Sequence, residues 1–440
     1  MLAFKAADKP KAKSEAEPFV PLTETPTEAS ATSVSTHYWP LLKHFAVRLC
    51  VAVTIALLLL AAVEFYSYLR FHPNVNALEL AAKLEIAQNE NPAERQYWAE
   101  FKKANKVTYH PWVLWRRQPF QGQMISIDQD GVRRTLHNHC DDKNAFTIWM
   151  FGDSVMWGAG APDKDTIPSY IAADYEKAGK PVCIVNYAEK GYANTQEVIG
   201  LMEELKHATR KPDEVLFYDG GTEAFIAYQS GQVDVHSNYL SFKNFLDNWG
   251  AYEKAGFSYF NQTNTARFLK KMGERADAGS KDKEKDKNKK AKAAMPTLDV
   301  AAASKAIVEN YSQNMDFVNL MAKQYNFRPV FAWYPNMAVG HKELTSYEQQ
   351  VLASEYHQFP DLGVIYKATY DRAREMKRPD LIYLGDLLDD QKDSLYVGIS
   401  HLKPEGNQIV ADHLFEILQQ AANKLAEAKP STSIRSNHVN

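Results

Sequence analysis

Residues 145–158 read AFTIWMFGDSVMWG, an apolar run that ends in Gly152, Asp153 and Ser154. An apolar run bounded by turn residues is typical of a strand that is buried on both faces of a sheet. Open α/β sheets form their sites at the carboxyl ends of such strands. Ser154 is therefore either a nucleophile at a strand end or a residue that only turns the chain there.

The chain after residue 145 shows a regular alternation of short apolar runs and stretches with helical periodicity. This alternation predicts an α/β domain with a central parallel sheet that is covered by helices on both faces. The predicted strands are residues 145–152, 181–188, 213–220, 327–335 and 380–386. The predicted helices are residues 166–179, 194–210, 303–326, 346–377 and 405–428.

An apolar segment near the N-terminus, Leu49–Leu69, has the length of one transmembrane helix. A buried helix is the weaker alternative because the segment is hydrophobic on all faces, and a cleaved signal peptide is disfavoured by the long polar leader. Lys43 and Arg48 precede the segment and only Arg70 follows it closely. This bias predicts a cytoplasmic N-terminus and an extracytoplasmic main domain.

The remaining boundaries follow from composition. We expect a disordered cytoplasmic tail, the transmembrane helix, a juxtamembrane helix with an accessory region, and the α/β domain. Within the accessory region, Arg133 and Arg134 are interpreted as solvated surface side chains rather than an anion site. The boundaries are 1–40, 45–70, 75–140 and 145–425, with a disordered charged insertion at 275–296 and a disordered tail at 426–440.

Net charge and cysteine content limit the possible partners. The formal charge of -3 lacks the basic footprint of a nucleic-acid-binding protein. Three cysteines exclude a disulfide scaffold and have no metal-ligand spacing, so neither a metal nor a cofactor is predicted. Cys140 and Cys183 either pair in an oxidising compartment or remain two buried thiols.

Four short motifs carry the candidate chemistry. Ser154 follows the first predicted strand, and Gly191 lies in NYAEKGYAN after the second. Thr222 lies in FYDGGTEAF at the end of the third strand, and His401 lies in SHLKPEGN before the last helix. A serine nucleophile needs a base, and histidine titrates in the right range. Each motif alone is weak because turns are rich in Gly, Asp and Ser.

Taken together, the four motifs resemble those of the GDSL/SGNH hydrolase family over residues 145–425. The resemblance implies a flavodoxin-like three-layer α/β sandwich, preceded here by the transmembrane helix. It also implies that Ser154 is the nucleophile, that His401 is the base, and that Gly191 and Thr222 bind the oxyanion or substrate. The membrane anchor resembles that of bacterial members linked to extracellular polysaccharides.

Two positions depart from the family pattern. Thr222 stands where an oxyanion-hole asparagine is usual, and Gly398 stands where an aspartate usually orients the histidine. Loss of one oxyanion donor costs roughly two to three orders of magnitude in rate. A Ser–His dyad then remains, with His401 oriented by a backbone carbonyl or by a carboxylate from the loop before it. The candidate carboxylates are Asp389, Asp390 and Asp393.

These observations predict a single-pass protein of the bacterial inner membrane. Its expected activity is that of a serine esterase or O-acyltransferase acting on acyl, above all acetyl, esters of a carbohydrate or cell-envelope polymer. The expected partners are that substrate, the bilayer through residues 49–69, and proteins of an envelope complex. The alternative is a catalytically degenerate SGNH-like binding or scaffold protein of a polysaccharide synthesis or export system.

Overall fold

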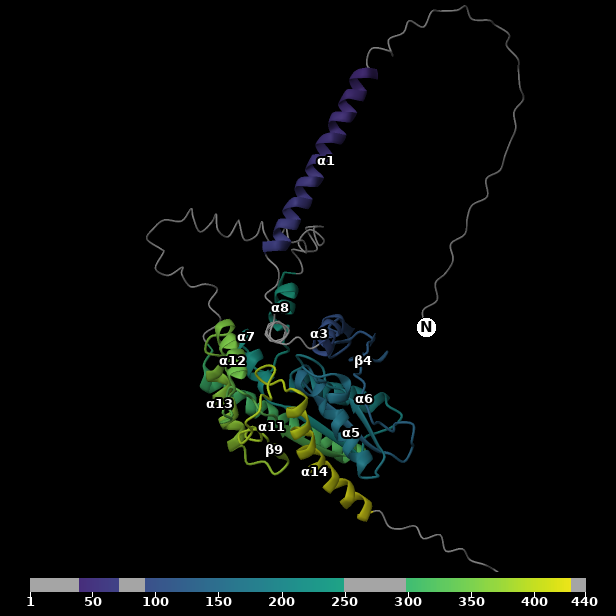
Figure 1. Ribbon diagram of the computed structural model, residues 1–440, viewed down its shortest axis with the longest axis vertical. Helices are drawn as coiled ribbons and strands as arrows, with labels where there is room; N and C mark the ends of the chain where they lie inside the picture. Colours follow the sequence, from purple (N-terminus) through teal and green to yellow (C-terminus); the bar gives the residue numbers. More distant parts are fainter. Residues whose placement is uncertain (1–38, 71–91, 249–297, 429–440) are drawn as a thin grey trace, which may run out of the picture. The chain divides into compact units, whose positions relative to one another are not determined.

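A computed structural model describes residues 39–70, 92–248 and 298–428 of the chain (Figure 1). The predicted N-terminal tail, the juxtamembrane helix and the charged insertion 275–296 lie outside these residues, as does the C-terminal tail beyond residue 428. The segment that contains helix α1 and the α/β domain form separate compact units and are described separately.

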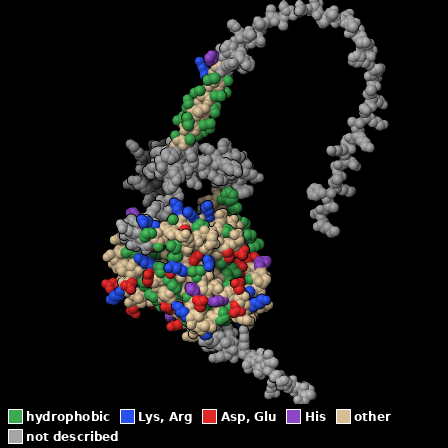
Figure 2. All heavy atoms as spheres, turned by 45° about the vertical axis from the view of Figure 1, so that its right-hand side comes forward, with side chains coloured by type: hydrophobic (Ala, Val, Ile, Leu, Met, Phe, Trp, Pro, Cys, Tyr) green, Lys and Arg blue, Asp and Glu red, His purple; other side chains and the backbone are tan. Residues whose placement is uncertain are grey.

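Helix α1 (Trp39–Arg70) contains the predicted transmembrane segment. Its stretch His44–Ala62 has a mean hydropathy of 2.5 over 19 residues. Figure 2 shows hydrophobic side chains along the visible face of this helix, whereas charged side chains of both signs are spread over the visible face of the α/β domain. The helix is long and apolar enough to cross a bilayer.

The α/β domain is built on a sheet of five parallel strands in the order β6-β5-β7-β8-β9. In chain order this is 2-1-3-4-5, the order of flavodoxin-like folds. The predicted fold is confirmed, and all five predicted strands are present. The strands are β5 (Phe146–Gly152), β6 (Val182–Asn186), β7 (Glu214–Asp219), β8 (Arg328–Trp333) and β9 (Leu381–Tyr383).

Helices cover both faces of this sheet and give the domain three layers (Figure 1). Side chains of β5 alternate between the two cores, with Ile148 and Met150 in one and Trp149 and Phe151 in the other. Both faces of the strand are therefore buried, which explains its unbroken apolar sequence. The first core contains α5 (Ile167–Lys177) and α14 (Pro404–Ala428), and the second contains α6 (Asn194–His207), α11 (Val300–Tyr325) and α13 (Leu362–Glu375).

Further helices lie around the carboxyl edge of the sheet. Helix α7 (Gly221–Ser230) follows β7 directly, and α8 (Tyr239–Asp247) comes next in the chain. Helix α12 (Ser346–Gln358) precedes α13. Neither α7 nor α8 was among the predicted helices.

The accessory region packs against the first core. Helix α3 (Pro92–Ala104) contributes three buried aromatic side chains, Tyr97, Trp98 and Phe101. A hairpin of β1 (Val107–His110) and β2 (Leu114–Arg117) follows, and then the short pair β3 (Phe120–Gln121) and β4 (Ser126–Ile127).

Cys140 and Cys183 form a disulfide bond. It joins the segment before β5 to strand β6, so the first of the two alternatives for these cysteines is the one found. Cys50, in α1, is the remaining cysteine and is free.

Candidate active site

Ser154 begins the four-residue helix α4 (Ser154–Trp157) directly after β5. Asp153 caps this helix, because its carboxylate accepts a hydrogen bond from the Val155 N–H at 2.7 Å. Gly152 has a φ of +153°, and a Cβ atom there would lie 2.6 Å from the Tyr218 carbonyl oxygen. Only glycine fits between the two strands at this point, so the sequence Gly-Asp-Ser fixes where the serine leaves the sheet.

His401 is the partner of Ser154. Ser154 Oγ and His401 Nε2 lie 2.8 Å apart, although 247 positions separate the two residues. His401 sits on a tight loop that is closed by the bridge between Tyr396 and Leu402 and by the Val397 N–H donating to the His401 carbonyl at 2.9 Å. The structure thus brings together the predicted nucleophile and the predicted base at hydrogen-bonding distance.

Among the described residues, no carboxylate lies at hydrogen-bonding distance of the second ring nitrogen of His401, Nδ1. Burial, assisted by the nearby Lys190 ammonium, lowers the pKa of His401 to about 3. A Cβ atom at Gly398 would lie 3.2 Å from His401 Nδ1, so the usual aspartate position does adjoin the ring. Within the described residues, neither a carboxylate nor a backbone carbonyl is hydrogen-bonded to Nδ1.

The three aspartates that were candidates for orienting His401 are not hydrogen-bonded to its ring. The Asp389 carboxylate contacts His341. Its Oδ1 accepts a hydrogen bond from the His341 backbone N–H at 2.8 Å, and its Oδ2 lies 3.2 Å from Nδ1 of the His341 ring. Asp393 lines a different cavity. Asp390 makes no hydrogen bond or ion pair to His401 among the described residues.

Gly191 lines the same cavity as Ser154 and His401. Its φ of +79° is one that glycine adopts freely, and a Cβ atom would lie 3.1 Å from Ser237 Oγ. Glu189, two residues earlier, donates its N–H to the Gly152 carbonyl at 3.1 Å and pairs with buried Arg117 at 2.7 Å. The loop that carries Gly191 is therefore fastened both to the nucleophile strand and to the β1–β2 hairpin.

Thr222 reaches the cavity, but its hydroxyl is engaged inside the protein. Thr222 Oγ1 donates to Asp153 Oδ2, and the Tyr334 hydroxyl donates to the same oxygen at 2.6 Å. Burial raises the pKa of Asp153, while these hydrogen bonds oppose the rise. In this geometry Thr222 stabilises the cap of the nucleophile helix, and its role toward an oxyanion stays a prediction.

A buried acidic cluster lies behind the motif of Thr222. Asn194 donates its side-chain N–H to Asp219 at 3.0 Å and its backbone N–H to Glu223 at 2.9 Å. Burial raises the pKa of Asp219 to about 7. Burial and the adjacent Asp219 carboxyl hold the pKa of Glu197 well above its ordinary value, and that of Glu223 is raised for the same reasons. The three carboxyl groups are therefore harder to ionise than exposed ones.

The cavity that Ser154 and His401 line has a volume of about 560 Å³. Lys190 and Arg117 also line it, but Arg117 is paired with Glu189, and burial lowers the pKa of Lys190. Other lining residues are aromatic side chains, two amides and Glu355, whose pKa is raised to about 7 by burial. Aromatic faces together with amide and carboxyl groups suit a ligand with both apolar faces and hydroxyl groups. These lining residues are Phe225, Gln229, Glu355, Gln358, Phe359 and Tyr366.

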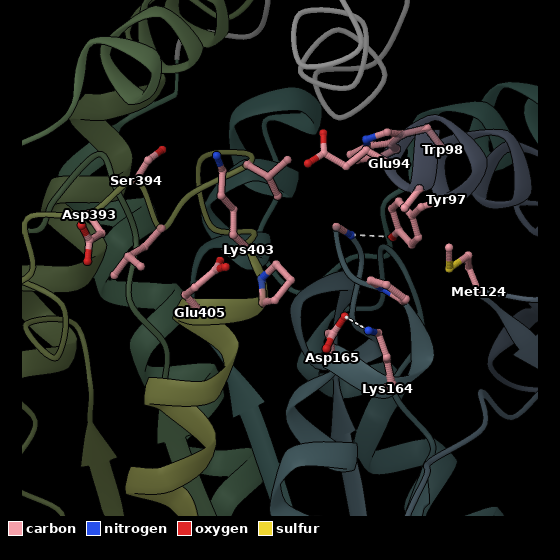
Figure 3. A pocket seen from close by; sticks show the side chains of 16 residues that line it. Glu94, Tyr97, Trp98, Met124, Lys164, Asp165, Asp393, Ser394, Lys403 and Glu405 are labelled. Atoms are coloured by element: carbon pink, nitrogen blue, oxygen red, sulfur yellow. Dashed lines mark hydrogen bonds and ion pairs between the residues drawn. The ribbon is translucent and has the colours of Figure 1, made fainter. Parts of the chain in front are cut away.

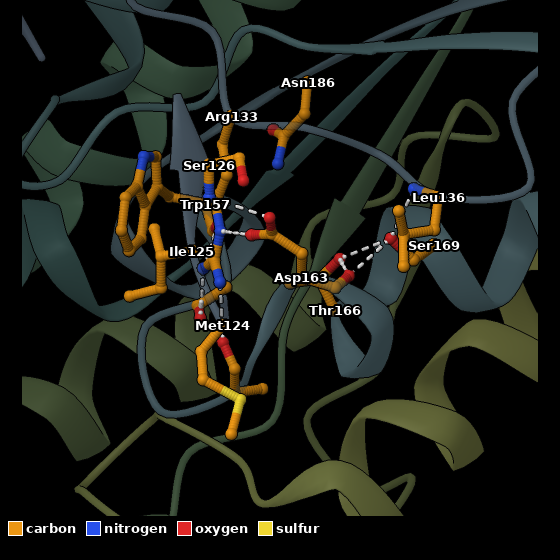
Figure 4. Close-up of polar contacts among 12 residues, drawn as sticks. Met124, Ile125, Ser126, Arg133, Leu136, Trp157, Asp163, Thr166, Ser169 and Asn186 are labelled. Carbon is orange, nitrogen blue, oxygen red and sulfur yellow. Dashed lines mark hydrogen bonds and ion pairs between the residues drawn. The ribbon is translucent and has the colours of Figure 1, made fainter. Parts of the chain in front are cut away.

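Arg133 corrects the prediction of a solvated arginine. Its side chain is completely buried and lies within 4.4 Å of the centroid of the Trp157 ring (Figure 4). It pairs with Asp163 at 2.9 Å and donates to the carbonyls of Trp157, Gly158 and Ala161 at 2.6–3.0 Å. These carbonyls belong to the end of α4 and the residues after it, so Arg133 fixes the loop that follows the helix beginning at Ser154.

A second cavity of about 560 Å³ is lined by residues of α3, of the segment after α4 and of the segment that leads into α14 (Figure 3). It contains neither Ser154 nor His401 among its lining residues. The Tyr97 hydroxyl accepts a hydrogen bond from the Gly160 N–H at 2.7 Å in its wall. Its charged side chains are Glu94, Lys164, Asp165, Asp393, Lys403 and Glu405.

One group of described residues has donor atoms close enough to share a metal ion. These are His341, Asp386 and Asp389, whose ligand atoms lie within 4.8 Å of one another. None of them lines the cavity that contains Ser154.

Several residues of the site were not singled out in the sequence. Arg117 and Glu189 act together although they lie 72 positions apart, and no local pattern links them. Lys190 directly precedes Gly191 in the sequence, so the motif that contains Gly191 could have pointed to Lys190. Glu355 lies in helix α12, where a glutamate is a common residue and gives no signal.

Neither the family models nor the curated proteins contain a match to this chain. Solved structures do match. A lipolytic protein of the G-D-S-L family from Veillonella parvula is 10% identical, with a TM-score of 0.34 over 63% of this chain and 100% of that one. The esterase EstA from a Pseudoalteromonas species is 11% identical, with a TM-score of 0.30 over 63% and 98%. The acetyl xylan esterase AlAXEase is 11% identical, with a TM-score of 0.32 over 62% and 100%.

The description of the Veillonella parvula protein names the family that the four motifs resemble, and the other two proteins are described as esterases. At TM-scores of 0.30–0.34 the likenesses do not assign an activity to this chain.

Proposed function

We propose that the protein is a membrane-anchored serine esterase or O-acyltransferase whose domain works outside the cytoplasm. The observation that carries the proposal is the 2.8 Å contact of Ser154 Oγ with His401 Nε2, in a cavity that Gly191 also lines. Helix α1 supplies the anchor, and the disulfide between Cys140 and Cys183 supports an oxidising compartment.

The geometry supports a two-step acyl transfer. Ser154 Oγ attacks the ester carbonyl carbon while its proton passes to His401 Nε2. The oxyanion that forms is bound by backbone N–H groups, for which those of Ser154 and Gly191 are the candidates. His401 then gives the proton to the departing alcohol oxygen, and the acyl group stays on Ser154. Water or an acceptor hydroxyl, deprotonated by His401, releases the acyl group.

The aromatic, amide and carboxyl side chains that line the cavity support a carbohydrate substrate. Gln229, Gln358 and Glu355 offer donors and acceptors for hydroxyl groups, and Phe225 and Phe359 offer apolar faces. Such a mixture matches the two kinds of surface of a sugar ring. An acetylated carbohydrate or envelope polymer is therefore the proposed substrate class.

Covalent labelling tests this proposal. The full-length protein in detergent should react with a fluorophosphonate probe at Ser154, and Ser154→Ala should abolish labelling. His401→Gln should slow labelling strongly, because the base is removed and the fold is kept. A wild-type protein that neither labels nor hydrolyses short-chain aryl esters would contradict the proposal.

The alternative function is a catalytically degenerate binding or scaffold protein. Two observations favour it: Nδ1 of His401 lacks a carboxylate partner, and Thr222 donates to Asp153. Under this alternative Ser154→Ala leaves carbohydrate binding intact and the wild type stays unlabelled.

The proposed topology has its own test. A C-terminal alkaline phosphatase fusion should be active in bacterial cells if the domain is extracytoplasmic. An inactive fusion that is present at the normal level would reverse the orientation.

A further inference from the structure

The tip of the β1–β2 hairpin exposes two aromatic side chains. Tyr109 is 71% exposed and Trp112 is 72% exposed. Trp112 also has a φ of +68°, in the left-handed region that bulky residues rarely adopt. The hairpin thus holds a tryptophan in water in a costly backbone conformation. Tyrosine and tryptophan in such positions are typical of surfaces that meet the headgroup layer of a membrane.

Helix α8 exposes further apolar side chains and buries none of its residues. Leu246 is 62% exposed, Leu240 43% and Phe242 39%. Phe242 and Leu246 are four positions apart and therefore lie on the same face of the helix. A contiguous exposed apolar patch marks an interaction surface rather than ordinary solvent-facing residues.

These two features form one surface, which we call the aromatic rim. Tyr109 is paired with Trp115 across the hairpin, and the Trp115 ring lies 6.3 Å from that of His236. The His236 ring in turn lies 5.2 Å from that of Phe242 on α8. The rim comprises Tyr109, Trp112, Leu240, Phe242 and Leu246.

The aromatic rim borders the catalytic cavity. Trp115 donates its indole N–H to the Lys190 carbonyl at 3.4 Å, next to Gly191. Ser237, which follows His236 and precedes α8, lines the cavity itself. A surface that binds the rim would therefore face the entrance to Ser154.

Exposed lysines accompany the rim. Lys102 and Lys103 end helix α3, and Lys106 immediately precedes β1. A cluster of lysines next to exposed aromatic residues complements anionic phospholipid headgroups, each lysine contributing about fivefold to the affinity. This charge pattern selects a lipid surface over an uncharged apolar partner.

We propose that the aromatic rim docks onto the surface of an anionic bilayer and places the catalytic cavity at the headgroup layer. The proposal rests on the anchoring that is part of the proposed function. Residues 71–91 join α1 to α3 and reach at most about 75 Å when extended, so an anchored domain stays close to the bilayer. An amphipathic helix such as α8 then lies in the interface with its apolar face inward.

The test uses full-length Cys50→Ala protein reconstituted into vesicles that contain phosphatidylglycerol. Because Cys140 and Cys183 are bonded to each other, this background has a single reactive cysteine after each added substitution. An environment-sensitive dye is attached at Leu246→Cys or Trp112→Cys. We expect blue-shifted emission and quenching by lipids that carry a nitroxide near the headgroup.

Leu320→Cys is the matched control, because Leu320 is also a leucine that is 62% exposed. It lies on α11, which leads into the opposite, amino edge of the sheet, and its dye should stay unquenched. Phe242→Asp with Leu246→Asp should reduce quenching of the dye at position 112. Replacing the three lysines by glutamine should reduce it in anionic vesicles.

Equal emission at positions 246, 112 and 320 would overturn the proposal. Self-quenching at position 246 that rises with protein density, without lipid quenching, would show an interface between copies and would overturn it too. Fluorophosphonate labelling of the same vesicles reports on Ser154 independently. Loss of the protein from the vesicles on an alkaline wash would refute membrane anchoring by α1. Lipid quenching in unwashed vesicles would still decide whether the aromatic rim docks onto the bilayer.

Discussion

Gly398→Asp places a carboxylate beside the one ring nitrogen of His401 that lacks a partner. The Cβ of the new side chain would lie 3.2 Å from Nδ1, so the ring must move by a few tenths of an ångström. The φ of Gly398 is not in the left-handed region, so backbone strain does not oppose the substitution. We expect the variant to fold and its carboxylate to reach hydrogen-bonding distance of Nδ1.

The expected effect follows from the charge that His401 acquires in catalysis. Its pKa of about 3, against 6.5 for a free histidine, corresponds to about 5 kcal/mol against the imidazolium. A carboxylate about 4–6 Å from the ring centre, at an effective dielectric constant near 20, returns about 3–4 kcal/mol. The pKa of His401 then rises by about 2–3 units. If half of that energy is expressed in the transition state, the rate rises roughly 10- to 30-fold.

The assay is the second-order rate of fluorophosphonate labelling from about pH 4 to about pH 9. A base must be neutral to accept a proton, so a pKa near 3 keeps the wild-type rate level down to about pH 4–5. In the variant the rate should be higher at about pH 8 and should fall below about pH 5–6. Gly398→Asn is the control, because it has nearly the same shape without the charge.

Two results would refute this reasoning. One is a folded Gly398→Asp protein whose acid limb coincides with that of the wild type. The other is an Asn variant that gains as much rate as the Asp variant, because the gain would then come from packing rather than from charge.

Three further predictions concern the neighbours of the dyad. Thr222→Val removes the hydroxyl that binds Asp153, so we expect a labelling rate within about tenfold of the wild type, against the hundredfold loss of an oxyanion donor. Glu189→Ala leaves Arg117 buried and unpaired and should destabilise the domain by about 3–5 kcal/mol in urea titrations. Glu204→Ala, which breaks a more exposed arginine pair, is its control and should cost less. Glu197→Gln should raise the melting temperature at about pH 8 more than at about pH 5. A carboxyl group whose pKa is raised by folding makes the folded state less stable as the pH rises above the ordinary pKa of that group. An equal change of the melting temperature at both pH values would contradict this.

The sheet could be predicted from the sequence because a strand that is covered on both faces needs apolar side chains along its length. Strand β5 is covered on both faces, so apart from Thr147 its side chains are apolar and its limits are visible in the sequence. Helix α7 was missed because it begins with Gly221 and only Gly220 separates it from β7. Helix α8 was missed because its amphipathic pattern extends over only nine residues, Tyr239–Asp247.

The site was predictable where the chemistry depends on residue identity. Ser154 and His401 are brought together at 2.8 Å, as their motifs suggested. The support of the site was not predictable, because it consists of long-range contacts. Arg133 shows this most clearly: an arginine after a turn is usually solvated, but here four donors meet Asp163 and three carbonyls behind α4. Only the fold reveals such a set of acceptors.

The two departures from the family pattern have different consequences in the structure. Thr222, which stands at the position of the usual asparagine, has a structural contact instead. Its hydroxyl donates to Asp153, the residue that caps the helix beginning at Ser154. At Gly398 nothing replaces the missing carboxylate among the described residues, and His401 stays neutral over the physiological pH range. The balance between an active enzyme and a scaffold therefore depends on how strongly His401 can act as a base, which is the quantity that Gly398→Asp changes.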